Sequence, residues 1–257
     1  MDRRQIRLRR EYLYQKEKER EEVKNKDQTV DKQESKDCEY SDFNGLPNLL
    51  LTTSRDPSSR LKQFQKELSL LFGSATVINR GAYKVKDLYD LGIKNGFTDI
   101  VIVHENRGEP DGLIVSHLPV GPTLFFGLGN TVLRHDAKGM KGTISGSIPN
   151  LIFHNFNEEK IGRRLKMALQ HLFSVNPIET SKRVVTFAAS NEHISVRHHG
   201  YKKSDHIDID VEELGPRFEL RPYMIKLGNL LQSNSTIEWS LKTHINTSKK
   251  NKHISLE

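Results

Sequence analysis

The apolar residues of positions 47–138 switch between the spacing of a strand and that of a helix. A continuous run at 49–53 predicts a buried strand. Asp56 followed by Pro57 predicts the N-cap and first residue of a helix, which Gly73 would end. Between them, apolar side chains recur at helical spacing at Leu61, Phe64, Leu68, Leu71 and Phe72.

The same half is expected to contain a second helix and four more strands. The helix is weaker and runs from Val85 to Asn95. A turn-rich stretch at 105–112 separates two of the strands. The strands are expected at 75–79, 100–103, 113–115 and 123–128.

The second part of the chain repeats this order after a glycine-rich connector at 139–147. A strand is expected at 151–153, followed by a helix with Asn157 as its N-cap. The apolar face of that helix consists of Ile161, Leu165, Ala168, Leu169, Leu172 and Phe173. Strands are then expected at 184–188, 194–198 and 207–211, with a loop that begins at Gly200.

Short landmarks recur at the start and the end of both parts. Pro47-Asn48-Leu49 is matched by Pro149-Asn150-Leu151, and Gly121-Pro122 by Gly215-Pro216. This ordered succession indicates an internal duplication, and it predicts an α/β (α+β) fold of two pseudo-symmetric halves with helices on one face of a mixed sheet. The predicted domains are a charged segment at 1–46, a central domain at 47–232 (halves 47–138 and 149–232) and a polar tail at 233–257.

Charge is unevenly distributed along this polar chain. The formal net charge is +7, the pI is near 9.3 and the mean hydropathy is −0.62. Residues 1–45 contain 12 basic and 12 acidic residues, so the positive excess lies on residues 46–257. A folded domain with such an excess is suited to a polyanion, and ordinary solubility charge is an equal alternative.

The first segment is predicted to form a polar helix at 3–26 that needs a partner, because little apolar surface is available to stabilise it. Its basic arm is typical of a nuclear localisation signal or an RNA-binding arm, with a disordered tail as the alternative. The arm consists of Arg3, Arg4, Arg7, Arg9 and Arg10. Neither a secretory signal nor a membrane span is expected.

The chemistry of known enzyme motifs is missing from the sequence. No Walker loop, dinucleotide fingerprint, zincin motif or nucleophile elbow occurs. Cys38 is the only cysteine, which excludes an intrachain disulfide and a four-cysteine zinc site. Six of the eleven histidines follow residue 190, but their spacing matches no common metal site, so surface or strand histidines are expected instead. No catalytic residue, metal or cofactor is therefore predicted.

Basic side chains near aromatic ones are the best candidates for function. In the strand predicted around residue 197, Arg197 lies on the face opposite Ile194 and Val196, and Lys202 and Lys203 follow in a turn. Arg217, Arg221 and Tyr223 share a face of the next stretch, where Pro222 favours either an edge strand or a helix start. Such surfaces hold phosphates and stack bases, while a solvated sheet face is the plain alternative.

A second group of basic candidates lies at the turn that leads into the first helix. Arg55 and Arg60 flank the helix start, whose free amides are suited to a phosphate. Arg55 could instead pair with Asp56 or Glu67 and have a purely structural role.

Three long motifs resemble the signatures of the Brix-domain family of eukaryotic ribosome-assembly proteins. They are LTTSRDPSSRL at 51–61, GLIVSHLPVGPT at 112–123 and GPRFELRPYMIKLG at 215–228. The match extends over about 48–232, and the arginine-rich RLRREYLY at 7–14 extends it over nearly the whole chain.

This resemblance implies two halves that are each similar to the anticodon-binding domain of class II aminoacyl-tRNA synthetases. It also implies a non-enzymatic, nucleolar role in the small-subunit processome, where U3 small nucleolar RNA pairs with pre-rRNA. The partners it implies are the Mpp-ten scaffold and the Imp-three protein. The alternatives are a basic protein–protein adaptor, an RNA-modifying enzyme, and a Brix protein of large-subunit assembly.

Overall fold

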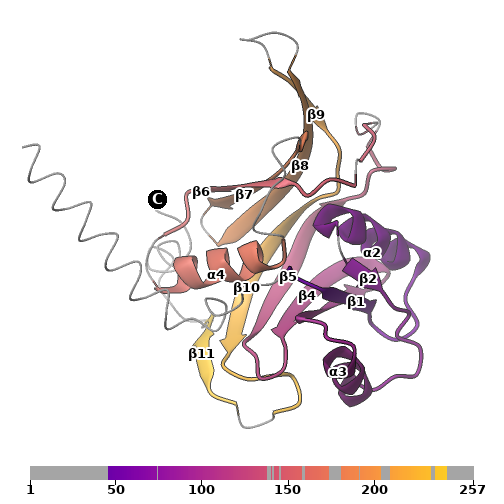
Figure 1. The fold of residues 1–257 in the computed structure, drawn as a ribbon, viewed down its shortest axis with the longest axis vertical. Helices are drawn as coiled ribbons and strands as arrows, with labels where there is room; N and C mark the ends of the chain where they lie inside the picture. Colours follow the sequence, from indigo (N-terminus) through magenta and orange to yellow (C-terminus); the bar gives the residue numbers. More distant parts are fainter. Residues whose placement is uncertain are drawn as a thin grey trace, which may run out of the picture. The chain divides into compact units, whose positions relative to one another are not determined.

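Eleven strands of the described residues form one mixed sheet in the computed structural model (Figure 1). The structure describes residues 46–241, except 74, 138–139, 141, 145, 158–159, 174–180, 191, 204–208 and 233–234. In half one the elements are β1 (Leu49–Thr53), α2 (Ser59–Phe72), β2 (Ala75–Val77), α3 (Val85–Lys94), β3 (Asp99–Asn106), β4 (Glu109–His117) and β5 (Thr123–Val132). In half two they are β6 (Asn150–His154), α4 (Lys160–His171), β7 (Arg183–Ser190), β8 (His193–Lys203), β9 (Ile209–Glu213) and β10 (Arg217–Lys226). Strand β11 (Ile237–Ser240) follows, within the segment predicted as a polar tail.

The strand order confirms the two pseudo-symmetric halves. It runs β2-β1-β3-β4-β5-β10-β8-β7-β6, with β11 beside β10 and β9 beside β8. In both halves a parallel pair, β1 with β3 and β6 with β7, is followed by two antiparallel neighbours. The antiparallel pair β5–β10 joins the halves at the centre. Each of these two strands follows a cis Gly-Pro peptide with glycine at positive φ, at Gly121 and Gly215.

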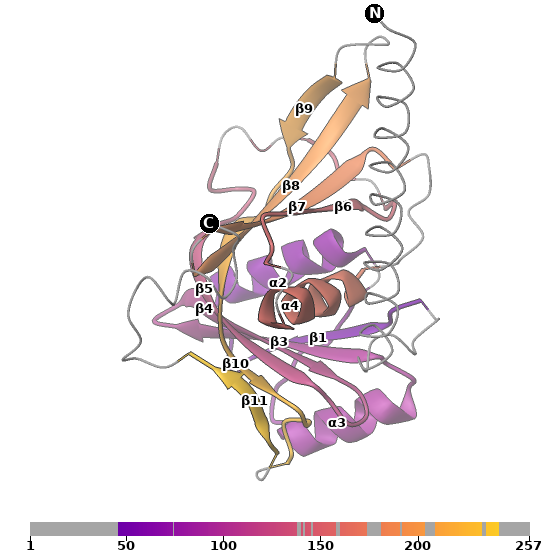
Figure 2. The same ribbon diagram turned by 90° about the vertical axis from the view of Figure 1, so that its left-hand side faces the viewer.

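Helices α2 and α4 lie on the same face of the sheet, which we call the inner face (Figure 2). Phe64 of α2 packs edge-on against Phe218 of β10, with ring centroids 5.5 Å apart. Phe173, just after α4, packs against Phe187 of β7 at 5.9 Å. Phe218 pairs with Val196, which pairs with Phe187, so these side chains share one face.

Helix α3 packs on the opposite, outer face of half one. Its Tyr89 joins Leu50, Ile100 and Ile102 in a buried cluster. Half one is therefore covered on both faces, and its β3 residues Asp99–Val103 are all buried. In half two, no helix among the described residues covers the outer face. None of the described helices has the length and apolar character needed to cross a bilayer.

Three local predictions are wrong. The N-cap of α2 is Ser58, whose hydroxyl accepts from Leu61 N at 3.1 Å, while Asp56 lies in the preceding turn at φ 49°. The turn between β3 and β4 is only 107–108, because pairing extends to Asn106. Gly200 is within β8 instead of starting a loop, since β7 and β9 pair with it on either side. The ends of α2 at Gly73 and of α3 at Asn95 are confirmed.

Pro222 lies in a central strand, so neither an edge strand nor a helix begins there. Strand β10 pairs with β5 along its length, whereas on its other edge β8 pairs with 218–220 and β11 with 224–226. Pro222 falls between those two partners, where its missing N–H costs no ladder bond. Strict alternation from Phe218 and Leu220 would bury Met224, but the register shift beside Pro222 reverses the pattern, so Ile225 is buried instead.

Candidate nucleic-acid interface

Three of the predicted RNA-binding arginines share the outer face of β8 and β10. The inward residues Phe218 and Leu220 are buried, so Arg217 and Arg221 alternate onto the outer face. On β8, Val196 is buried beside Phe218, and Arg197 faces outward. The Arg197 guanidinium donates to the carbonyls of Val196 and Phe218, at 3.0 and 3.4 Å. These backbone contacts hold it flat against the sheet.

Carboxylates hold the two β10 arginines. Arg217 Nη2 lies 2.9 Å from Glu213 Oε2, and Arg221 Nη2 contacts Glu192. The arginine side chains remain 36% and 47% exposed. A guanidinium has five N–H donors, so one carboxylate leaves donors available for a phosphate. The pairs therefore orient both cations while reducing their net positive field.

Two glycines extend this face across half one. On the outer face, His104 of β3 pairs with Gly112 of β4, Gly112 pairs with Gly127 of β5, and Gly127 pairs with Arg221 of β10. We call these four residues the glycine row. At roughly 4.8 Å per strand step, its ends are about 14 Å apart. The two central positions expose backbone without side chains, so a ligand can approach the sheet closely there.

Tyr223 is the aromatic group of this face. Its side chain is 43% exposed, and its ring lies 5.9 Å from that of Phe125. Burial of the phenol, with the nearby charge of Asp111, raises its pKa, so the hydroxyl stays neutral at physiological pH. Lys226 lies over Phe125, 5.8 Å from the ring centroid. An exposed ring beside cations suits base stacking.

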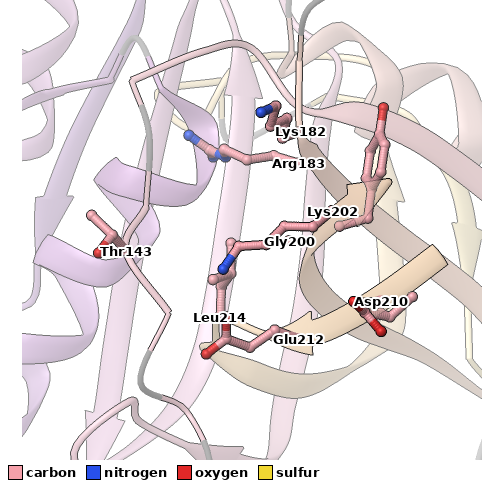
Figure 3. A pocket seen from close by; sticks show the side chains of 10 residues that line it. Thr143, Lys182, Arg183, Gly200, Lys202, Asp210, Glu212 and Leu214 are labelled. Atoms are coloured by element: carbon pink, nitrogen blue, oxygen red, sulfur yellow. The ribbon is translucent and has the colours of Figure 1, made fainter. Parts of the chain in front are cut away.

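Lys202 is separated from Arg197. Both predicted lysines lie in β8 and not in a turn, and alternation places Lys202 on the opposite face from Arg197. Lys202 lines a pocket of about 450 Å³ at the base of the β8–β9 hairpin, with Arg183, Asp210 and Glu212 (Figure 3). Basic and acidic groups offset one another there, which makes the pocket a poor phosphate site.

A carboxylate of the protein itself, that of Glu105, occupies the predicted phosphate-binding position at the start of α2. The Glu105 carboxylate accepts from the Ser58 backbone N–H at 2.9 Å and from the Ser58 hydroxyl. Arg60 is held by Glu109 at 2.6 Å and Asp136 at 2.9 Å, and the hydrogen bond with Asp136, then that with Glu109, raise its pKa. Arg55 is exposed. The expected cations are present, but Arg60 is neutralised and a carboxylate occupies the helix terminus.

Sequence patterns missed a buried cluster that joins the two halves. Asp99 Oδ1 lies 2.9 Å from His117 Nδ1, and Asp99 Oδ2 lies 3.3 Å from His171 Nε2. All three side chains are buried, and their donor atoms lie within 4.8 Å of one another. Burial alone would raise the pKa of Asp99, but the hydrogen bonds from His117 and His171 outweigh it and hold that pKa below its usual value.

The Asp99 cluster predicts a stability effect without an effect on RNA binding. Asp99→Asn removes the buried charge and one acceptor, and we expect the free energy of unfolding to fall by about 1–3 kcal/mol. Urea unfolding at neutral pH measures this loss. Asp90→Asn, at an exposed position of α3, is the matched control and should change little. A destabilisation equal to that of the control would show that the cluster contributes nothing to stability.

The predicted basic arm, Arg3, Arg4, Arg7, Arg9 and Arg10, lies outside the described residues. The side chain of Lys203, the last residue of β8, also lies outside them. Their roles stay predictions.

Comparison with known proteins accounts for this architecture. Residues 54–224 match the Brix domain. The chain is 49% identical over 212 residues to the U3 small nucleolar ribonucleoprotein protein IMP4 of Homo sapiens, covering 82% of this chain and 72% of that protein. It is 43% identical over 220 residues to IMP4 of Saccharomyces cerevisiae, covering 85% and 75%.

A solved structure shares the fold. The probable ribosomal biogenesis protein of Aeropyrum pernix K1 superposes with a TM-score of 0.51 at 22% identity, over 68% of this chain and 96% of that one. The extent of the family match and the identity to its curated relatives lead to one conclusion. The chain belongs to the Brix domain family.

Proposed function

We propose that this protein is an RNA-binding component of the U3 small nucleolar ribonucleoprotein, acting in pre-18S rRNA processing and small-subunit assembly. The names of its relatives, U3 small nucleolar ribonucleoprotein protein IMP4, support the assignment. The observation that carries the RNA-binding part is the outer face of half two, where Arg197, Arg217, Arg221 and Tyr223 lie together and no described helix covers them. The protein acts by positioning U3 RNA and pre-rRNA in the nucleolus, without catalysing a reaction.

The proposal extends to the protein partners. The Mpp-ten scaffold and the Imp-three protein are expected to bind this chain in the same particle. Glu192, Glu213 and Glu219 are interleaved with the arginines of the outer face. This mixed charge also suits an adaptor that binds a charged protein segment, which is the second candidate function.

RNA affinity measured against salt concentration tests the first candidate. We expect Arg217→Gln with Arg221→Gln to weaken binding of single-stranded RNA about tenfold and to flatten the salt slope by roughly one to two units. Lys62→Gln with Lys66→Gln, on the exposed side of α2, removes the same charge and serves as control. An unchanged slope in the arginine variant would exclude this face as the RNA site.

Recovery of crosslinked RNA from cells tests the particle assignment. U3 RNA and pre-rRNA of the small subunit are the expected species. Enrichment of large-subunit pre-rRNA would instead support a role in large-subunit assembly, and a preference for an acidic scaffold peptide over RNA in competition would support the adaptor.

A further inference from the structure

We propose that half one contains a second RNA phosphate site, formed by Thr52, Ser54, Arg80 and His104, and that the glycine row guides one RNA strand from it to Arg221. The inference rests on the proposed RNA-binding function. The proposal adds a binding site on half one, whose outer face is elsewhere covered by α3.

The site lies at the carboxyl ends of parallel strands. Strands β1 and β3 run side by side, with Thr53 beside Val103, and Ser54 N donates to Val103 O at 2.9 Å. Thr52 pairs with Ile102 on the outer face, and His104 comes two residues after Ile102 on the same side. The carboxyl edge of parallel strands is where α/β sheets bind ligands.

Arg80 closes this corner from the connection between β2 and α3. Its side chain is only 9% exposed, and its Nη1 reaches Thr53 O at 3.5 Å, the outer limit of a hydrogen bond. Its Nε is buried and has no hydrogen-bond partner in the described part of the chain. A buried guanidinium without a carboxylate is costly, and an anionic ligand would supply the missing acceptor.

Two hydroxyls in the same corner also lack partners. Thr52 Oγ1 and Ser54 Oγ are buried without hydrogen bonds among the described residues. Together with Arg80 Nε, they place three unsatisfied polar groups at the end of one strand. Hydroxyl and guanidinium donors are the groups that bind phosphate oxygens in nucleic-acid complexes.

The local electrostatics favour an anion. Burial, with the neighbouring charge of Arg55, lowers the pKa of Arg80, and burial with the charge of Arg80 lowers that of His104. Arg80 therefore lies close enough to Arg55 and to His104 for its charge to act on each of them. Tyr83, 53% exposed, follows Arg80 in the same turn and could stack a base.

The glycine row supplies the path between the two sites. A Cβ at Gly127 would meet Arg221 Cβ at 4.0 Å and Arg221 O at 3.8 Å, and one at Gly112 would meet His104 Cβ at 3.6 Å. A Cβ at either position would therefore make only ordinary van der Waals contacts, so local packing does not require glycine there. Close approach of an RNA backbone does require a bare strand.

The test uses the full-length chain and a fluorescent single-stranded RNA. We expect Arg80→Met to lower RNA affinity about three- to tenfold and to reduce the salt slope by roughly one unit. Its melting temperature should stay level or rise, because an unpaired buried charge is removed. Gly127→Val should also keep the fold and weaken binding, by blocking the row. Lys66→Met is the charge-matched control.

The outcomes of this test distinguish a failure of the second phosphate site from a failure of the proposed RNA-binding function. If wild type binds RNA and Arg217→Gln with Arg221→Gln weakens it, while Arg80→Met and Gly127→Val bind like wild type, the second site is excluded and the proposed function stands. If wild type does not bind RNA, the proposed function fails. Inorganic phosphate then decides the corner site alone, since it should raise the melting temperature of wild type but not of Arg80→Met at constant ionic strength. Equal responses would overturn the site.

Discussion

Arg183→Met is expected to lower the free energy of unfolding by about 3 kcal/mol, and the melting temperature by roughly 10 °C. Arg183 is 2% exposed. Its Nη2 donates to the carbonyls of Leu70 and Leu71 at 2.9 and 3.0 Å, and its Nε donates to His198 Nε2 at 3.2 Å. The variant would leave these three acceptors buried without their donor.

The position of these carbonyls explains the size of the effect. They belong to the last turn of α2, where backbone acceptors have no partner within the helix and where a positive charge is favourable. Because α2 is in half one and Arg183 begins β7 in half two, the contacts join the halves. Burial lowers the pKa of Arg183 to about 10, so it remains protonated at neutral pH.

Chemical unfolding of three variants measures this contribution. Lys182→Met changes the adjacent exposed residue and should leave stability nearly unchanged. Arg183→Lys keeps the charge but loses the planar donor to His198, so it should recover part of the loss. Wild-type stability in Arg183→Met would show that the halves are held together without this residue.

Stability is expected to fall by about 3 kcal/mol as the pH drops from 6.5 to 4, because of His198. This side chain is fully buried. Its Nδ1 lies 2.7 Å from Gly215 O and must donate to that carbonyl, while its Nε2 accepts from Arg183. Only the contact with Arg183 requires the neutral ring, because a second proton on Nε2 would face the guanidinium.

The sign of the effect follows from the pKa. Burial, and then repulsion from Arg183, lowers the pKa of His198 from 6.5 to about 4. The unfolded chain therefore takes up a proton before the folded one does. The stabilisation is complete above pH 6.5 and is lost as the pH falls toward 4. The contribution of Asp99, whose pKa is also lowered, disappears only below its ordinary value of 3.8.

Unfolding in denaturant at several pH values checks this expectation. His198→Gln can donate to Gly215 and accept from Arg183 without titrating, so its stability should depend less on pH than that of wild type. His193→Gln, at an exposed position of the same strand, should keep the wild-type dependence. Equal pH dependence in wild type and His198→Gln would refute the assignment.

Local patterns predicted the elements well where one face is buried. Alternation placed Arg197 on the face opposite Ile194 and Val196 on β8, and the structure agrees, with Ile194 and Val196 buried. Where a local signal had two solutions, tertiary context chose between them. Asp56 and Ser58 are both good N-cap residues for α2. Ser58 is the N-cap in the structure, where it also forms hydrogen bonds with Glu105, 47 positions away in the chain.

The residues of the candidate sites also fall into two groups, those that a local pattern predicts and those that only tertiary contacts bring together. The outer arginines of β10 were predictable, because they alternate with apolar residues. The turn at 107–108 would by itself set Asp99 opposite Ser116, and a β-bulge between His104 and Glu105 shifts the register by one residue, so the Asp99–His117 pair could not be found from the turn. His171 and Arg80 could not be predicted either, because one depends on how α4 docks and the other on a connection folded over the end of β1.

The sequence alone determined the order of strands and helices from β1 to β8, the duplication, and the inward and outward faces of regular strands, because these follow from the local periods of helix and strand. The tertiary structure alone decided which strands pair and in which register. That choice set β5 against β10, placed Gly127 beside Arg221 and left Arg80 Nε buried without a hydrogen-bond partner among the described residues. The physical reason is that strand pairing depends on contacts between residues far apart in the chain. The free energy of these contacts exceeds the local conformational preference of each segment.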